Sequence, residues 1–309
     1  MTIRIGISGW RYGRWRGVFY PKGLRQKDEL SFAAETFKSI EINGTFYSLQ
    51  SPDLFGRWMA QTPDDFVFAL KGPRYVTHML KLKNARPALA NFFASGVLRL
   101  EQKLGPILWQ LPPNLGFDAA RLAAFFALLP RDTDAAVRLA RGHNSKLKRR
   151  AWLRTKENRV LRHAIEVRHD SFKTPEFIDL LRKHAVALVC ADTVEWPLLM
   201  DVTADFVYCR LHGSQQLYAS GYSDRALGTW AKRVCAWENG GDAEGEHASP
   251  VPAKPRKSRD VYVYFDNDAK VRAPFDALKL RAKLERRPRR ARRIGAPDGP
   301  SKTGSSGKH

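Results

Sequence analysis

The chain has 309 residues, 43% of them hydrophobic, which allows one large domain or two ordinary domains with a sizeable core. Lysine and arginine exceed aspartate and glutamate by 22 charges at pH 7, which favours acidic partners. No apolar run reaches the roughly 18 residues of a membrane span, and the first residues lack the pattern of a signal peptide. The three cysteines lack metal-site spacing, so we predict a cytoplasmic protein without a membrane partner.

Eight short apolar segments, each bounded by glycine, proline, asparagine or aspartate, are typical of β-strands. In chain order they are residues 4–10, 39–47, 66–73, 106–113, 163–170, 187–193, 205–213 and 261–267. Helical patterns follow most of them, including residues 28–37, 86–103 and 273–285. The residues predicted to cap further helices are Ser51, Asp118, Thr174 and Ser223. The segment WPLLMDVTA after the sixth strand is too short for a full helix.

Eight strands alternating with helices predict a parallel sheet, and eight is the number that closes a TIM-like (β/α)8 barrel. Such barrels commonly need about 250 residues, so we predict an α/β fold with a single barrel domain over residues 1–285. A doubly wound open sheet is the alternative. Its dinucleotide-binding form requires G-x-G-x-x-G after the first strand, and GISGWRYG at residues 6–13 does not have that spacing.

Three segments fall outside the alternating pattern. Residues 131–162 form a basic insertion before the fifth strand, which we predict to be helical. Residues 240–259 are rich in glycine and proline and predict a flexible linker before the eighth strand. Residues 286–309 are basic and then rich in glycine and serine, which predicts a disordered tail.

The excess positive charge is concentrated in two stretches. Residues 141–162 contain nine basic residues and one acidic residue, and residues 279–293 contain the same numbers. Such segments favour polyanions, so we predict that nucleic acid binds through them. The alternative is a solvated basic surface and tail.

Alternation along each strand separates residues that face the helices from residues that face the barrel interior. The polar side chains predicted to face inward are Ser8, Glu41, Asn43, Lys71, Gln110, Glu166, Arg168, Asp192, Arg210 and His212. On the eighth strand the pattern allows either Tyr264 and Asp266 or Phe265 and Asn267 to face inward. Because the polar residues lie toward the C-terminal strand ends, where barrel enzymes place their sites, we predict a functional pocket. A structural ion-pair network is the alternative.

Aromatic residues gather in the loops that follow the strands. They are Trp10, Tyr12, Trp15, Phe19 and Tyr20 after the first strand, Phe46 and Tyr47 after the second, and Tyr218 and Tyr222 after the seventh. Around a polar mouth, such side chains can stack on bases or sugar rings, with arginines adding cation–π contacts. Ordinary loop packing is the alternative interpretation.

The segments GWRYGRWRGVFYP, EINGTFY, FALKGPRYVTH, WQLPP, EVRHDSF, YCRLHG with YSDRAL, and YVYFDN resemble the YecE-like family, a bacterial domain-of-unknown-function family. They occur in order between about residue 3 and residue 285 and fall near the strand ends. The resemblance implies a TIM-barrel fold and little about chemistry. Its barrel is distantly similar to the apurinic endonuclease and sugar-isomerase barrels, which is an analogy at the level of the fold.

The first functional hypothesis is a protein that binds or acts on nucleic acid or another phosphate-containing anion at the barrel mouth, with a phosphodiester hydrolase as its enzymatic form. The residues that would hold phosphate are Lys71, Arg168 and Arg210. Glu166 or Asp192 would act as the general base and His212 as the acid. The other residues predicted to bind substrate are Asn43, Gln110, Trp10, Tyr12, Trp15, Tyr47, Tyr222 and Asn267.

Two further hypotheses belong to other classes. A sugar- or sugar-phosphate-processing enzyme would use Glu41 and Glu166 as an acid/base pair, with Trp10 or Trp15 as the platform for the sugar. A non-catalytic barrel would bind a small anion. No organic cofactor is expected, because the chain has no phosphate-binding loop. The residues that could hold a single divalent metal ion are Glu166, Asp192 and His212.

Overall fold

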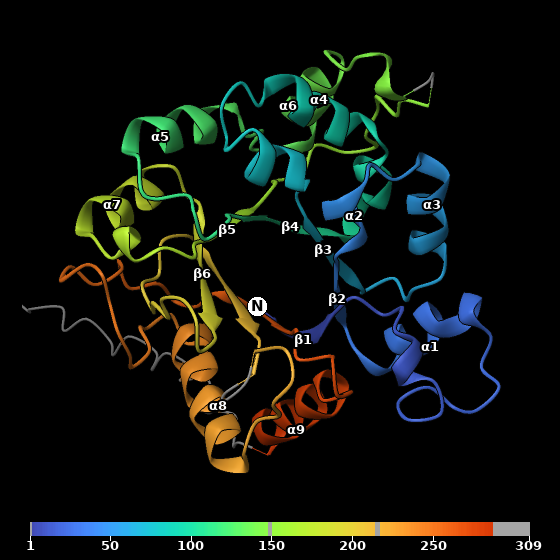
Figure 1. Ribbon diagram of the computed structural model, residues 1–309, viewed down its shortest axis with the longest axis vertical. Helices are drawn as coiled ribbons and strands as arrows, with labels where there is room; N and C mark the ends of the chain where they lie inside the picture. The colour runs from blue at the N-terminus through green and yellow to red at the C-terminus, as the bar shows by residue number, and fades with distance from the viewer. Residues whose placement is uncertain (1, 148–149, 214–216, 287–309) are drawn as a thin grey trace, which may run out of the picture.

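The computed structural model describes residues 2–147, 150–213 and 217–286. Eight parallel strands close into a barrel in which each strand pairs with the next in the chain and the last pairs with the first (Figure 1). The strands are β1 (Ile3–Ser8), β2 (Ser39–Ile42), β3 (Val67–Lys71), β4 (Leu104–Gln110), β5 (His163–Glu166), β6 (Ala187–Asp192), β7 (Phe206–Leu211) and β8 (Asp260–Phe265). The predicted TIM-like (β/α)8 barrel is confirmed, and the open sheet is excluded because β1 and β8 are hydrogen-bonded.

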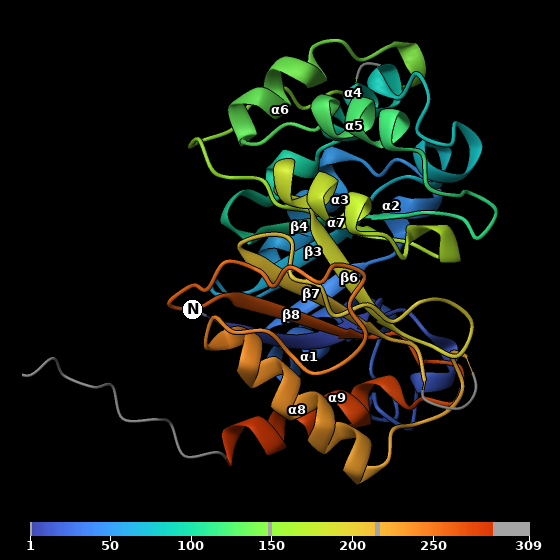
Figure 2. The same cartoon turned by 90° about the vertical axis from the view of Figure 1, so that its left-hand side faces the viewer.

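Helices surround the barrel, as Figures 1 and 2 show from two directions. They are α1 (Glu29–Thr36), α2 (Gly44–Tyr47), α3 (Pro52–Ala60), α4 (Arg86–Ala94), α5 (Ala119–Leu128), α6 (Thr133–Ala140), α7 (Pro175–Lys183), α8 (Asp224–Glu238) and α9 (Ala273–Glu285). Each predicted cap accepts a hydrogen bond from a backbone N–H three residues later: Ser51, Asp118, Thr174 and Ser223. Among the described residues, no helix is long and apolar enough to cross a bilayer.

The barrel interior has an apolar layer below a charged layer. The apolar and aromatic side chains that pack together inside are Val67, Ala69, Leu108, Ala164, Ala187, Val189, Ala191, Phe206, Tyr208, Tyr262 and Tyr264. The intervening strand residues, such as Ile7 and Ile40, pack outward into the larger core beneath the helices. Because the interior is filled, a ligand can enter only above the charged layer, at the C-terminal strand ends.

The loop of residues 240–259 covers the barrel where the short β6–β7 connection provides no helix (Figure 1). The carboxylate of Asp201, in that connection, accepts the backbone N–H groups of Ala248 and Ser249 at 2.8 and 3.1 Å. Arg182 of α7 donates to a backbone carbonyl of the loop at 2.9 Å. These contacts argue against a freely flexible linker, although its behaviour in solution stays a prediction.

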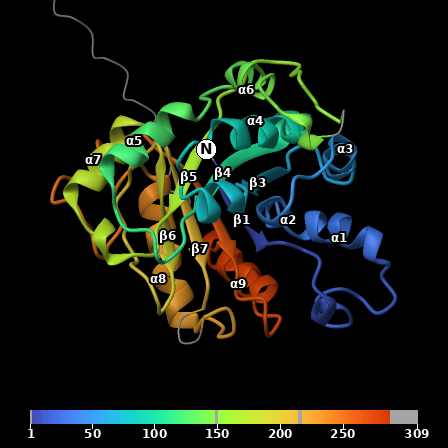
Figure 3. The same cartoon turned by 45° about the horizontal axis from the view of Figure 1, so that its top comes forward.

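The basic insertion is only partly helical. It begins with α6, which packs against α4 (Figures 1 and 3), and it contains one further short helical turn, Ser145–Leu147. Residues 150–162 have no regular secondary structure apart from a bridge between Asp132 and Val160. The helical prediction is therefore wrong for residues 150–162. The predicted tail, apart from Arg286, lies outside the described residues.

Candidate functional site

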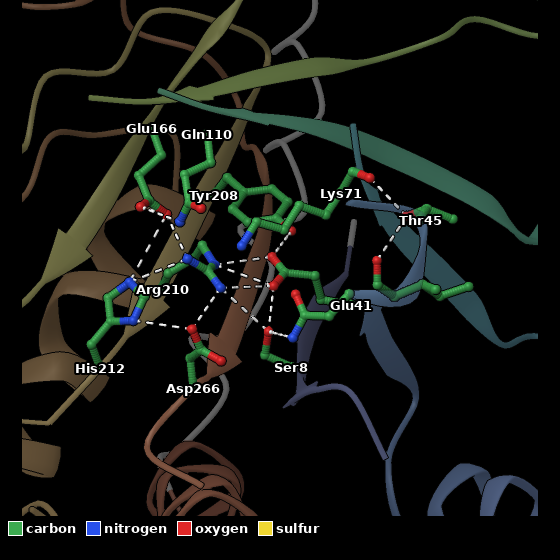
Figure 4. Close-up of polar contacts among 12 residues, drawn as sticks. Ser8, Glu41, Thr45, Lys71, Gln110, Glu166, Tyr208, Arg210, His212 and Asp266 are labelled. Atoms are coloured by element: carbon green, nitrogen blue, oxygen red, sulfur yellow. Dashed lines mark hydrogen bonds and ion pairs between the residues drawn. The ribbon is translucent and has the colours of Figure 1, made fainter. Parts of the chain in front are cut away.

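A buried cluster of charged side chains forms the upper layer of the barrel interior, and Arg210 of β7 lies at its centre (Figure 4). Its Nη1 donates to Glu166 Oε2 at 2.6 Å, and its Nη2 donates to Asp266 Oδ2 at 2.7 Å. Its Nε and Nη2 also donate to the two carboxylate oxygens of Glu41, at 3.1 and 3.0 Å. One guanidinium therefore neutralises carboxylates that reach it from β2, β5 and the end of β8.

Glu41 has a complete set of partners. Ser8 Oγ donates to one carboxylate oxygen, and Tyr208 Oη donates to the other at 2.6 Å. Asn43 Nδ2 donates to Ser8 Oγ at 3.0 Å, so the amide supports the serine from above. A carboxylate held by so many donors is a fixed structural element, which argues against Glu41 as one half of an acid/base pair.

Glu166 is engaged in the same way. Arg168 Nε donates to its Oε1 at 2.7 Å, and Gln110 Nε2 donates to the same oxygen at 2.8 Å. Burial alone would raise the pKa of Glu166, but the charges of Arg168 and Arg210 outweigh burial and hold the pKa well below its usual range. A general base needs a free oxygen and a pKa nearer to neutral, so these contacts argue against the predicted catalytic role of Glu166.

His212 bridges two members of the cluster. Its Nε2 lies 3.3 Å from Arg210 Nη1, and because a guanidinium only donates, this nitrogen is the acceptor. Its Nδ1 lies 3.2 Å from Asp266 Oδ2. Both ring nitrogens thus face cluster members, and the imidazole is fully buried. Nδ1 makes no hydrogen bond of good geometry with the described residues, but His212 does not line the cavity, which argues against its predicted role as acid.

A cavity of about 790 Å³ opens above the cluster. Its cationic lining residues are Arg11, Lys71, Arg74 and Arg168, and its acidic ones are Asp266 and Asp268. Aromatic side chains from loops and from α2 and α3 complete the wall: Trp10, Tyr12, Phe46, Tyr47, Trp58 and Tyr218. Cations outnumber acids, and Asp266 already pairs with Arg210, so the cavity favours an anionic ligand with a flat or apolar part.

Lys71 is a buried cation of the cavity wall. It ends β3, and only 7% of its surface is exposed. Its ammonium makes no hydrogen bond or ion pair with the described residues and lies 4.3 Å from the centroid of the Phe46 ring. Burial, followed by the charge of Arg210, lowers the pKa of Lys71 to about 8.

Two titratable groups of the cavity were not among the predicted site residues. Burial and the charge of Asp266 raise the pKa of Asp268 to about 6. Burial and the charges of Arg168 and Lys71 lower the pKa of His78 to about 4, so this imidazole is neutral at pH 7. Asp268 lies in a turn after β8 and His78 in a short π-helix after β3 (Tyr75–Met79), so strand alternation gives no signal of which way their side chains point.

Several predicted site residues do belong to the cluster or its cavity. The strands bring together Glu41, Lys71, Gln110, Glu166, Arg168, Arg210 and His212, and the loops add Trp10, Tyr12, Asn43 and Tyr47 to the cavity wall. Their roles in binding or catalysis stay predictions. For the eighth strand, Tyr264 packs inside the barrel and Asp266 follows it into the cluster.

The inward orientation predicted for Asp192 is wrong. Ala187, Val189 and Ala191 face the interior, so Asp192 points outward, where it accepts a hydrogen bond from Trp230 Nε1 of α8 at 2.7 Å. Burial raises the pKa of Asp192 despite this hydrogen bond. The predicted metal ligands Glu166, Asp192 and His212 therefore do not converge. The described residues contain no cluster of three or more metal-ligating side chains.

Three other residues predicted to bind substrate lie outside the cavity. Trp15 is fully buried, with its ring centroid 4.6 Å from that of Tyr12, and it supports the first loop from below. Asn267 donates to Asp276 of α9 at 2.9 Å, because the strand alternation turns it outward. Tyr222 accepts a hydrogen bond from the backbone N–H of Gly213 and fixes the loop after β7.

A second cavity of about 570 Å³ adjoins the first and shares Phe46, Tyr47 and Arg74 with it. Tyr75 lies in its wall, and the ammonium of Lys146 lies 4.7 Å from the centroid of that ring. The mouth therefore continues into a groove that carries aromatic and cationic side chains, on the side of the barrel where the basic insertion begins.

Curated relatives of the chain match it over part of their length. The UPF0759 protein YecE of Escherichia coli (strain K12) is 30% identical over 114 residues, which are 37% of this chain and 39% of that protein. The UPF0759 protein YunF of Bacillus subtilis (strain 168) is 26% identical over 116 residues, 36% of this chain and 40% of the relative. The matched stretch spans about two fifths of the length of these relatives.

Solved structures show the same barrel. A DUF72 family protein from Thermotoga maritima MSB8 superposes with a TM-score of 0.70 at 25% identity, covering 92% of this chain and all of that one. A second one, from Enterococcus faecalis V583, gives a TM-score of 0.66 at 16% identity, which shows the fold alone. The family described as "Protein of unknown function DUF72" matches residues 4–301. The predicted YecE-like resemblance is confirmed, and the chain belongs to the DUF72 family.

Proposed function

We propose that the chain binds a phosphate-containing anion in the cavity at the C-terminal mouth of the barrel. The observation that carries this proposal is the ammonium of Lys71, which has no ion-pair partner in the described part of the chain. Leaving a buried charge without a partner costs several kcal/mol, roughly 3–5 when one member of a buried pair is removed. A bound oxyanion would supply the missing partner.

The surrounding cations support the proposal. Arg168 donates to Glu166 from one edge of its guanidinium, and its Cζ lies 4.0 Å from the centroid of the Trp196 ring, which holds the group in place at the cavity wall. Arg74 lies exposed at the rim, between the cavity and the adjoining groove. Together with Lys71, they offer donors at the ends of β3 and β5, and planar guanidinium groups suit phosphate oxygens.

The aromatic wall favours a ligand with a ring. Trp10 and Tyr47 line the cavity, and 69% of the surface of Tyr47 is exposed. Such side chains stack on bases and sugar rings, so nucleotides and sugar phosphates fit better than inorganic phosphate. A phosphodiester hydrolase is a weaker form of the proposal, because Glu166 is engaged and Asp192 faces a helix.

Isothermal titration calorimetry with adenosine 5′-monophosphate, glucose 6-phosphate, adenosine and glucose tests this function. The phosphorylated compounds should bind and their neutral counterparts should not. Lys71→Met should weaken binding at least tenfold. Lys146→Met removes a cation from the groove outside the cavity and serves as the matched control, with unchanged affinity for these small compounds. Equal affinity of the phosphorylated and neutral compounds would overturn the proposal.

The adjoining groove favours nucleic acid as a second candidate ligand. Tyr75 and Lys146 extend the aromatic and cationic surface beyond the mouth, and single strands are bound by stacking platforms in positively charged grooves. Affinity for oligodeoxythymidylates should then rise with length beyond a mononucleotide. Tyr75→Ala should remove this gain without changing mononucleotide binding, and affinity independent of length would exclude this candidate.

A further inference from the structure

The amine of Lys71 has an environment unlike that of Lys103, which is also buried. Lys103 Nζ donates to the backbone carbonyls of Met59 and Thr62, each at 2.7 Å, and has an ordinary structural role. Lys71 Nζ has an aromatic ring at 4.3 Å and no hydrogen-bond acceptor among the described residues. It also lines an open cavity, so a small molecule can reach it.

We propose that Lys71 forms an imine with the carbonyl group of an anionic aldehyde or ketone bound in the mouth cavity. This inference rests on the proposed anion-binding function and names a chemical class within it: a compound that carries both an oxyanion and a carbonyl. In this arrangement Arg74 and Arg168 hold the oxyanion, while Lys71 reacts with the carbonyl carbon.

The reaction balances without an oxidant or a reductant. The lone pair of the neutral Lys71 amine attacks the carbonyl carbon, forming the C–N bond, and a proton passes from nitrogen to the carbonyl oxygen. The resulting hydroxyl group takes up the proton that the Lys71 ammonium released to the solvent when it became neutral, and it leaves as water. The product is a protonated imine, whose positive charge lies on the former lysine nitrogen.

The surroundings favour both the attacking amine and the charged product. Burial and the charge of Arg210 lower the pKa of Lys71 to about 8, so at pH 7 its neutral fraction is roughly 300-fold larger than that of an ordinary lysine. The ionised groups that act on it from the other strands are Arg210, Asp266, Glu41 and Glu166. The three carboxylates stabilise the cationic imine once it has formed.

The test uses the full chain and two probes that differ in one group. D-Glyceraldehyde 3-phosphate carries a phosphate and an aldehyde, whereas glycerol 3-phosphate carries the phosphate and no carbonyl. The protein is incubated with substoichiometric aldehyde, treated with sodium borohydride and digested, and the modified lysine is located by mass spectrometry. We expect modification at Lys71 to exceed that at the exposed Lys146 by at least tenfold, and glycerol 3-phosphate in excess to suppress it.

Lys71→Arg separates the two proposals, because it retains the positive charge and cannot form the imine at neutral pH. Binding of glycerol 3-phosphate should persist in this variant, while borohydride trapping of the aldehyde disappears. Binding without trapping in the unmodified chain would overturn the imine and leave the anion site standing. Absence of both binding and trapping would overturn both. Labelling spread evenly over the exposed lysines would also overturn the imine.

Discussion

Arg210 and Glu41 lie on β7 and β2, which β8 and β1 separate in the barrel, and they form a fully buried ion pair with Nη2 and Oε1 3.0 Å apart (Figure 4). The same guanidinium holds Glu166 and Asp266. Carboxylates on β2, β5 and the end of β8 are thus joined by one cation from β7. Of the cations in the cavity wall, Arg168 also pairs with Glu166, whereas Lys71 and Arg74 have no ion-pair partner among the described residues.

Replacing Arg210 should therefore destabilise the fold more than replacing Arg168. Arg210→Met strands buried carboxylates and should lower the free energy of unfolding by about 3–5 kcal/mol or prevent folding. Arg168→Met leaves Glu166 with Arg210 and Gln110 as partners, so the loss should be roughly 1.5–3 kcal/mol. Urea denaturation of the two variants measures both values. An equal or larger loss for Arg168→Met would contradict this ranking.

The same two substitutions distinguish scaffold from binding residue. Arg168 lines the cavity whereas Arg210 lies beneath it, fully buried. Arg168→Met should therefore weaken binding of adenosine 5′-monophosphate at a modest cost in stability. Gln110→Leu is the matched control, because it also removes a hydrogen bond to Glu166 but no positive charge. If both variants lose the same affinity, binding depends on the position of Glu166 and not on the positive charge of Arg168.

Strand alternation predicted most of the buried cluster. The outward face of a strand packs against helices and is apolar, so the polar residues between the apolar ones must face the barrel interior. In β2, Ile40 and Ile42 face outward and Glu41 therefore faces inward. For β6, the apolar residues on both faces are similar, and Ala191 rather than Asp192 continues the inward row. The predicted alternation in β6 was shifted by one residue, so Asp192, which contacts α8, was assigned to the barrel interior.

The cavity was harder to predict than the cluster. Asp268 lies in a turn and Arg74 at the start of a short π-helix, both beyond the strands, so the alternation of the strands cannot locate their side chains. Trp15 was predicted to bind substrate, but it is fully buried. An aromatic residue near the mouth can either line the cavity or fill the core of a loop, and the sequence pattern does not distinguish the two. The composition of residues 240–259 also could not show that this loop is held by Asp201. This residue lies far away in the sequence and accepts backbone hydrogen bonds from the loop.

Asp201 should protect the loop of residues 240–259 against proteolysis. Asp201→Ala removes the acceptor of two backbone N–H groups and should expose the loop, so that trypsin cleaves after Arg256 or Lys257 at least several-fold faster. Mass spectrometry of time points locates the cut. Asp242→Ala is the control, because it removes a single exposed hydrogen bond within the loop. Rapid cleavage after Arg256 or Lys257 in the unmodified chain would support the flexible linker instead.

Deleting residues 286–309 should weaken binding of single-stranded DNA and flatten its salt dependence. The segment contains eight lysine and arginine residues, and removing one phosphate contact reduces the slope of log K against log salt by about 0.7 for single strands. The barrel should remain folded, because α9 ends at Glu285. Fluorescence anisotropy at several salt concentrations measures the slope. An unchanged slope would make the segment irrelevant to nucleic acid binding.

Asp268 should make anion binding depend on pH near neutrality. Because burial and Asp266 raise its pKa to about 6, Asp268 gains a negative charge in the cavity as the pH rises from 5 to 7, and this charge repels an anion. Lys71, with a pKa of about 8, then loses its positive charge between pH 7 and 9. Affinity for an oxyanion should therefore fall in two steps, each of roughly three- to tenfold.

Sulfate is the suitable probe for this profile, because its own charge is constant between pH 5 and 9. Asp268→Asn should abolish the step near pH 6 and raise the affinity for sulfate at pH 7, while the step near pH 8 remains. Asp179→Asn, on the exposed face of α7, also removes one negative charge and should leave both steps in place. If both variants keep the step near pH 6, Asp268 does not act on the bound anion, and the lower step belongs to another group.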